Sequence, residues 1–326
     1  MIQRFAVPVG AGAVSALLFA LVAKGTPLAV ALAYLAPLPL MIAAFGWGAL
    51  GGLVAAAIAV AAAAVVFGPQ GALAFAFAVA LPAWLLPTFA VLPRYAPPWR
   101  RADPGAPART PIGAVAAAAA AFGAIAGLAG LATLILGSSG YEAGLQSLID
   151  ELTPVIDQTL ADIVSLPEGV AARDVAEEIA KLAPLATATF GFLTLCLNLY
   201  LAARSTALSH RLPRPWPDLP SEFVLPRPLA VVAVLAIGAA IALPEPTDQF
   251  AWVFAGPLFA VYVLQGLATL HALSRGLPLR PLLLVALYGC CAVRPQWTLP
   301  LIAVVGLIDA AANLRARAAS ARRSKV

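Results

Sequence analysis

The stretch GALGGLVAAAIAVAAAAVVF, residues 48–67, decides the fold class because it contains no charged and no strongly polar side chain. A helix needs about 20 mostly apolar residues to cross the hydrocarbon core of a bilayer. Inside lipid, a helix also satisfies its own backbone hydrogen bonds. The stretch therefore predicts a membrane-spanning helix.

Similar apolar segments lie on both sides of this stretch. The candidate spans are residues 5–23, 28–45, 48–67, 72–92, 112–136, 184–203, 228–243, 250–270, 281–293 and 296–312. The segment 281–293 is short for a span, so it is interpreted either as a re-entrant piece or as half of a tight hairpin with its successor. We predict an all-α fold, a polytopic transmembrane helix bundle with about eight to ten spans.

Composition supports this class. Hydrophobic residues make up 62% of the chain and charged residues 11%, whereas a soluble domain carries about 25% charged residues. A soluble protein this apolar could not cover its surface with polar groups, but lipid removes that requirement. The three cysteines lie in apolar stretches and are interpreted as small buried hydrophobes, not as a disulfide framework.

The distribution of lysine and arginine predicts the orientation. With a cytoplasmic N-terminus and ten crossings, sixteen basic residues fall on the cytoplasmic side: Arg4, Arg94, Arg100, Arg101, Arg109, Arg204, Arg211, Arg214, Arg227, Arg275, Arg280, Arg315, Arg317, Arg322, Arg323 and Lys325. Lys24, Arg173, Lys181 and Arg294 fall outside. We therefore predict a multi-pass membrane protein with both termini cytoplasmic. The basic fringe faces anionic lipid, and no nucleic-acid partner is predicted.

Two polar stretches divide the chain. Six units follow: a first transmembrane unit at 1–92, a cytoplasmic Pro/Arg loop at 93–111, two spans with an acidic insert at 112–204, a cytoplasmic loop at 205–227, a C-terminal transmembrane unit at 228–314 and a basic tail at 315–326. The tail is interpreted as a topology anchor.

The acidic insert, residues 138–183, holds nine of the fifteen acids. Its apolar residues from Leu145 to Ile163 recur at helical spacing, and Val175, Ile179 and Leu182 form a second short set. We predict two amphipathic helices on the outer face of the bundle, with Pro154 kinking the first and the Ser165–Pro167 pair starting the second. A solvated acidic spacer is the alternative.

Glycines suggest close helix packing. Residues 46–51 match the dinucleotide pattern GxGxxG, but an apolar helix precedes them where that motif needs a strand. A tight turn between two spans is the favoured interpretation. The pairs Gly48/Gly52 and Gly123/Gly127 let helix backbones approach closely. Internal packing is the default for them, and a docking face for a partner subunit is the alternative.

Prolines and polar residues within spans give the candidate binding residues. Pro37 and Pro39 fall within one turn near the middle of a span and free backbone carbonyls there. Broken helices of this kind supply groups to substrates in transporters. The polar candidates for a cavity are Asn198, Tyr200, Tyr262 and Gln265, and Asp309 with Asn313 forms a separate candidate polar site.

Asp309 has Arg315 six residues further on, a spacing at which helix geometry alone does not make an intrahelical pair. A structural tie is an equal alternative to a proton or substrate site. Asn198 could also simply bond a neighbouring helix. Signatures of enzymes are missing: there is no HExxH, Walker A or GxSxG pattern. No catalytic residue, metal site or cofactor is predicted.

The stretch Tyr34-Leu35-Ala36-Pro37-Leu38-Pro39, the turn Gly46-Trp47-Gly48 and the ending Gly306-Leu307-Ile308-Asp309 through Arg315 resemble the YybS-like family of bacterial membrane proteins. That family is distantly similar to substrate-binding subunits of energy-coupling-factor transporters and to the rod-shape protein MreD. The resemblance implies a location in the bacterial inner membrane, a six-helix unit over roughly residues 1–204 and no catalytic residue. The later spans and the acidic insert depart from that pattern.

Two functions follow as hypotheses. The first is a small-molecule-binding membrane subunit or transporter that works with partner subunits. It predicts that Pro37, Pro39, Asn198 and Gln265 converge on one cavity, open to the outside and roofed by the acidic insert. The second is a non-transporting scaffold of the cell envelope of the MreD type, which predicts a filled core and an exposed docking face. The ligand of the first is not specified by the sequence.

Overall fold

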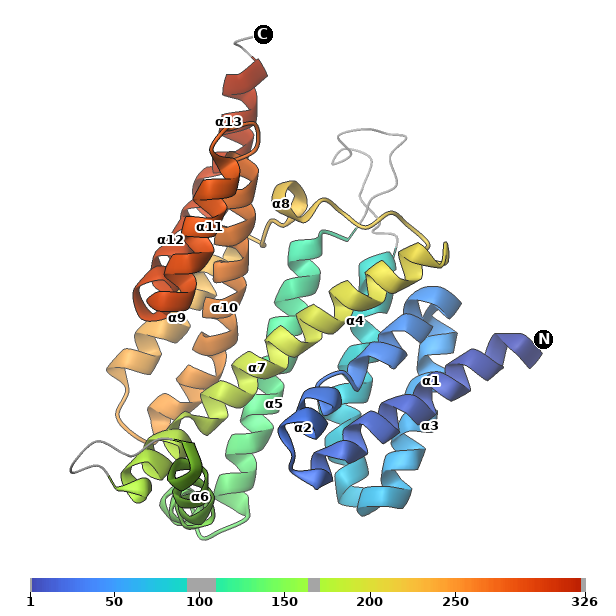
Figure 1. Cartoon of the computed structure of the whole chain (residues 1–326), viewed down its shortest axis with the longest axis vertical. Helices are drawn as coiled ribbons and strands as arrows, with labels where there is room; N and C mark the ends of the chain where they lie inside the picture. The colour runs from blue at the N-terminus through green and yellow to red at the C-terminus, as the bar shows by residue number, and fades with distance from the viewer. Residues whose placement is uncertain (1, 93–109, 164–170, 324–326) are drawn as a thin grey trace.

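The computed structural model describes residues 2–92, 110–163 and 171–323, and all regular structure in these ranges is helical. The predicted start of a helix at Ser165–Pro167 lies outside them. Figure 1 shows the helices as two groups joined by the long diagonal helix α7. The first group is built from α1 to α4, and the second from α9 to α13.

The first group contains two chain reversals inside one continuous helical run. Its elements are α1 (Ile2–Ala20), η1 (Leu21–Lys24), α2 (Pro27–Ala33), α3 (Pro37–Phe75), η2 (Ala76–Ala80) and α4 (Leu81–Val91). Gly48 and Gly68 have φ of 77° and 70°, a conformation that glycine adopts without strain. A Cβ on Gly52 would lie 2.6 Å from the Cβ of Ala44, so the pieces before and after Gly48 fold back on each other. The predicted turn between two spans is therefore present.

The middle of the chain supplies α5 (Ile112–Leu136), α6 (Tyr141–Ile163) and α7 (Ala172–Leu208). Gly123 and Gly127 let α5 lie directly on α7: a Cβ on Gly123 would stand 2.4 Å from Ala188 O, and one on Gly127 2.9 Å from Pro184 O. Both glycines thus pack helices as predicted. Gly48 does not, because its place is the turn.

The acidic helix α6 packs against the ends of α5 and α7. Its Tyr141, Leu145 and Ile149 are buried together with Leu131 of α5 and with Ala176 and Ala180 of α7. Pro154 lies inside α6 without ending it. The second amphipathic helix predicted near Val175 differs from the structure, because it is the first part of α7, which continues through Pro184 into the span. A break between the amphipathic helix and the membrane span was expected there, but the helix is continuous.

The C-terminal group consists of α8 (Leu219–Glu222), α9 (Pro228–Ala242), α10 (Thr247–Leu273), α11 (Arg280–Val293), α12 (Pro295–Ala312) and α13 (Leu314–Arg323). The helix α10 is its centre, with fourteen buried positions, whereas α11 has none. The helices α11 and α12 meet at Arg294, where Thr298 Oγ1 donates to Cys290 O at 3.1 Å. This is the tight hairpin that the sequence allowed.

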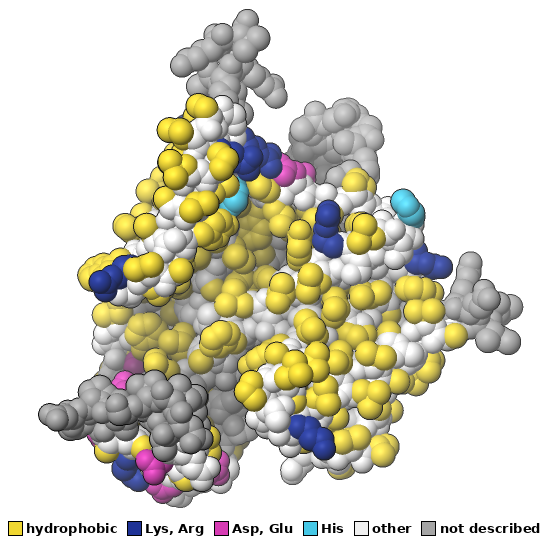
Figure 2. All heavy atoms as spheres, viewed as in Figure 1, with side chains coloured by type: hydrophobic (Ala, Val, Ile, Leu, Met, Phe, Trp, Pro, Cys, Tyr) yellow, Lys and Arg dark blue, Asp and Glu magenta, His cyan; other side chains and the backbone are white. Residues whose placement is uncertain are grey.

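Among the described residues, six helices are long and apolar enough to cross a membrane, and α9 and α11 are shorter apolar helices. One of the six runs from Pro27 to Val91 and includes the reversals at Gly48 and Gly68. Figure 2 shows apolar side chains over most of the visible face, with charged groups mainly toward its upper and lower ends. The protein is thus an all-α polytopic membrane bundle.

One face of the bundle gathers the turn at Gly48, the end of α4, the start of α5, the loop after α7, and α8 with α13, whereas α6 lies at the opposite end (Figure 1). We call these the α8 face and the α6 face. The basic residues Arg211, Arg214 and Arg275 belong to the α8 face. From the positive-inside rule we expect that face to be cytoplasmic.

We expect reporter fusions to place the two faces on opposite sides of the membrane. A fusion after Val326 is expected to give a cytoplasmic signal, because the basic residues gather on the α8 face. A fusion within residues 141–163 of α6 is expected to give an external signal. A cytoplasmic signal from the α6 fusion would contradict this orientation.

Candidate functional site

The break between α2 and α3 exposes backbone carbonyls that other helices then bond. Pro37 has no N–H, and Leu38 N donates to Leu35 O, so Tyr34 O has no partner within its own helix. Asn198 Nδ2 of α7 donates to Tyr34 O at 2.9 Å, and Ser15 Oγ of α1 donates to Ala36 O at 2.6 Å. Both side chains are completely buried. The break is therefore a junction of three helices.

A cavity of about 670 Å³ lies beside this junction. Its walls come from α1, η1, α2, the start of α3, η2, α5 and α7 and include Phe19, Val30, Pro37, Val79 and Phe190. The polar side chains on it are Tyr34, Thr187 and Thr194. Asn198 lies behind the wall and donates to the carbonyls of Tyr34 and Thr194, two lining residues. Its Oδ1 is buried and has no hydrogen-bond partner.

Among its described residues, the acidic insert contributes to the cavity only through the start of α7. Ile179, Leu182 and Ala183 of α7 line it, but no described residue of α6 does. The acidic helix packs instead on the far ends of α5 and α7 through Leu145 and Ile149. Ile179, Leu182 and Ala183 belong to the acidic insert 138–183, so the insert reaches the cavity through the start of α7; the apolar face of α6 packs on α5 and α7 instead.

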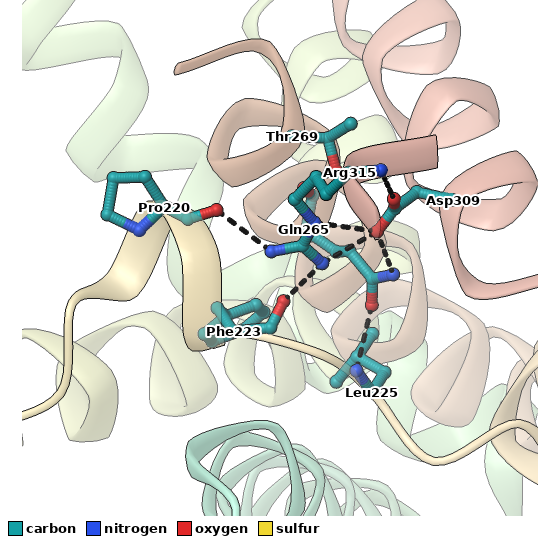
Figure 3. Close-up of polar contacts among 7 residues, drawn as sticks. All are labelled: Pro220, Phe223, Leu225, Gln265, Thr269, Asp309 and Arg315. Atoms are coloured by element: carbon teal, nitrogen blue, oxygen red, sulfur yellow. Dashed lines mark hydrogen bonds and ion pairs between the residues drawn. The ribbon is translucent and has the colours of Figure 1, made fainter. Parts of the chain in front are cut away.

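A second polar centre joins α8, α10, α12 and α13 (Figure 3). Arg315 Nη2 lies 2.6 Å from Asp309 Oδ2, and the two side chains are 9% and 3% exposed. Arg315 also donates to Pro220 O at 2.9 Å and to Phe223 O at 2.7 Å. We call this centre the arginine clasp. Each of its contacts is internal, and it fixes the segment around α8 to the end of α12.

Gln265 of α10 completes the arginine clasp. Its Nε2 donates to Asp309 Oδ2 at 3.1 Å, and its Oε1 accepts from Leu225 N at 3.0 Å. Both ends of the amide are therefore occupied. Thr269 Oγ1 donates to the backbone carbonyl of Gln265 at 2.9 Å.

The pairing of Asp309 with Arg315 depends on Asn313. This residue has φ 51° and ψ 52°, the left-handed conformation that asparagine tolerates better than most residues. It ends α12 and turns the chain so that Arg315 comes back to Asp309. A regular helix would not bring residues six apart together, so the sequence spacing concealed this contact.

A surface ion pair holds Asp218, the residue directly before α8. Arg275 donates to both carboxylate oxygens of Asp218, at 2.6 and 2.7 Å. Hydrogen bonds from Arg275 and then from Ser221 lower the pKa of Asp218 to about 2. The carboxylate therefore stays charged at all physiological pH values.

The predicted cavity residues do not all come together. Pro37 lines the cavity and Asn198 bonds its wall, whereas Gln265 belongs to the arginine clasp. No hydrogen bond joins Asn198 to Gln265 in the part of the chain described. Tyr200 lines a different hollow, between α7 and α10, with His271 and Tyr288. Tyr262 is 1% exposed and its hydroxyl has no partner.

The closest helix crossing was not found from the sequence. A Cβ on Gly266 would stand 1.9 Å from Ile302 O, and one on Gly306 2.3 Å from Tyr262 O. These two glycines lie 40 positions apart on α10 and α12, so no GxxxG pattern in the sequence marks them. Within the ranges described, no group of three His, Cys, Asp or Glu side chains could hold a metal ion.

A comparison with models of protein families shows to which family the chain belongs. The model of a family described as "Predicted membrane protein (DUF2232)" matches residues 13–310. The chain belongs to this family. The DUF2232 match includes both the break at Pro37 and most of the arginine clasp. No curated protein matches the chain, and no solved structure matches it. The DUF2232 description itself names a membrane protein and no activity.

Proposed function

We propose that the protein binds a small, mainly apolar molecule inside the membrane and acts as a binding subunit or transporter, in the manner of energy-coupling-factor substrate-binding subunits. The observation that carries this proposal is the 670 Å³ cavity beside the Pro37 break. Small-molecule pockets measure about 300–1,000 Å³, and their walls are mostly apolar with a few polar groups. The cavity fits this description in volume and in lining.

The lining favours an uncharged ligand. Phe19, Val30 and Phe190 offer apolar surface, while Thr187 and Thr194 can each hold one hydroxyl or carbonyl. No described residue of the lining carries a charge. An ion would lose its hydration here without gaining a partner, which is costly.

Replacing Ala183 with phenylalanine is expected to fill part of the cavity and to exclude the ligand. The protein would be purified from its membrane, extracted with solvent and examined by mass spectrometry. We expect an extractable small molecule at near-equimolar amount in the wild type and a loss of about tenfold in Ala183→Phe, because one ring occupies ligand space. Ala57→Phe adds the same ring to an exposed position and serves as the control.

Identical extracts from the wild type and Ala183→Phe, containing only bulk lipid, would contradict ligand binding in the cavity. The alternative function, an MreD-type scaffold, would then be preferred. One observation already favours that alternative: Gln265 and Asp309 are used entirely within the arginine clasp and leave no free group for transport. A scaffold would tolerate Ala183→Phe without any change in its partners.

A further inference from the structure

The segment between α7 and α8 is stiffened by prolines at alternate positions. It reads Leu212-Pro-Arg-Pro-Trp-Pro-Asp218, with prolines at 213, 215 and 217. A proline fixes its own φ and holds the preceding residue extended. Arg214 and Trp216 therefore project from a backbone that loses little entropy when a ligand binds.

A cavity of about 290 Å³ lies against this segment on the α8 face. It is formed where the end of α4 and the start of α5 meet the part of α3 just before the turn at Gly48. Phe45, Val91 and Val115 give it apolar walls, and Phe45 meets the Trp216 ring edge to face at 6.0 Å. Arg214 and Trp216 both line it. This cavity is separate from the one beside Pro37, with which it shares no lining residue.

Two residues that line this cavity each have a buried N–H donor with no acceptor among the described residues. Arg214 Nη1 and Trp216 Nε1 are both buried from solvent, and neither makes a hydrogen bond. No ion pair includes Arg214 in the described part of the chain. Glu222 also lines the cavity, but it is not within ion-pair distance of Arg214, and its Oε1 accepts from Asp218 N at 3.1 Å. Buried polar groups are nearly always bonded, so unpaired ones call for an explanation.

We propose that Arg214 Nη1 and Trp216 Nε1 together bind a phosphate group in this cavity. Both unpaired groups are donors, so the missing partner is an acceptor. Guanidinium binds phosphate strongly, through charge-assisted hydrogen bonds. The group can belong to an anionic lipid headgroup, whose chains would lie along apolar surface, or to free phosphate. In both cases phosphate oxygens would accept the hydrogen bonds from the two nitrogen atoms.

The test is ligand-dependent thermal stabilisation of the full-length protein in a neutral detergent. The probes are short-chain phosphatidylglycerol, short-chain phosphatidylcholine, the matching diacylglycerol without phosphate, and inorganic phosphate. We expect phosphatidylglycerol to raise the unfolding temperature in a saturable way, and diacylglycerol to give no shift. Stronger binding of phosphatidylglycerol than of inorganic phosphate identifies the lipid as the source, and equal binding identifies free phosphate.

The variants assign the effect to the cavity. Arg214→Gln is expected to weaken phosphate binding about tenfold or more, because it removes the positive charge and the guanidinium donors. Trp216→Phe is expected to weaken it several-fold, because it removes the indole N–H and keeps most of the side chain's bulk. Arg227→Gln removes one exposed cation from the neighbouring stretch and is expected to bind like the wild type. Arg214 makes no hydrogen bond with any of the described residues, so Arg214→Gln should fold with unchanged stability in the absence of phosphate.

Three results would overturn the proposal. One is the absence of a saturable shift with both phosphatidylglycerol and inorganic phosphate. Another is an equal loss of binding in Arg227→Gln and Arg214→Gln, which would mean general attraction by surface charge. The third is wild-type affinity in both Arg214→Gln and Trp216→Phe.

Discussion

Arg315→Ala is expected to destabilise the protein by about 3–5 kcal/mol, the usual cost of breaking one side of a buried ion pair. The substitution leaves the Asp309 carboxylate, 3% exposed, with only the amide of Gln265 as a side-chain donor. Pro220 O and Phe223 O lose their donors as well. The measurement is the thermal unfolding temperature in detergent, which should fall by about 10 °C.

Two control variants separate the arginine clasp from a general loss of charge. Arg317→Ala removes an exposed arginine two residues further on in α13 and should leave the unfolding temperature within about 2 °C of the wild type. The double variant Asp309→Asn with Arg315→Gln removes both charges and should recover part of the loss, because no uncompensated charge then stays buried. An equal fall for Arg315→Ala and Arg317→Ala would contradict the structural role of the clasp.

The clasp also shows what the sequence could and could not predict. The apolar periodicity and length of each segment depend only on local sequence, so the helical bundle, the turn at Gly48 and the packing of Gly123 and Gly127 were predictable. The Asp309–Arg315 contact depends on one left-handed residue, Asn313, whose conformation is set by tertiary contacts. A spacing of six residues therefore gave no signal.

The candidate cavity was predicted in part for a similar reason. Two prolines within a turn must leave carbonyls that another helix bonds, and Asn198 does so. Tertiary packing decides which helix lies beside the break. The sequence alone therefore did not show that Asn198 reaches the break and Gln265 does not. The unpaired donors of Arg214 and Trp216 could not be predicted, because counting the charges in a loop does not show which side chains lack a partner.

Gly266→Ala is expected to separate α10 from α12. The new Cβ would lie 1.9 Å from Ile302 O, a backbone atom that cannot rotate away, so the helices must move apart. Overpacking of this kind costs about 1–3 kcal/mol, and more where backbone is the obstacle. Separation would also stretch the 3.1 Å hydrogen bond from Gln265 to Asp309. We therefore expect a fall in unfolding temperature comparable to that of Arg315→Ala.

The matched control for Gly266→Ala is Gly238→Ala in α9, where an added Cβ meets nothing within 4 Å. Alanine is the better helix former, so this variant should be neutral or stabilised by up to about 1 kcal/mol. Gly306→Ala should resemble Gly266→Ala, since its Cβ would lie 2.3 Å from Tyr262 O at the same crossing. One separation of the helices relieves both clashes, so the double variant should lose clearly less stability than the two single losses added together. Strict additivity would mean that the two glycines do not share one crossing, and an unchanged unfolding temperature in Gly266→Ala would mean that the two helices do not lie in contact there.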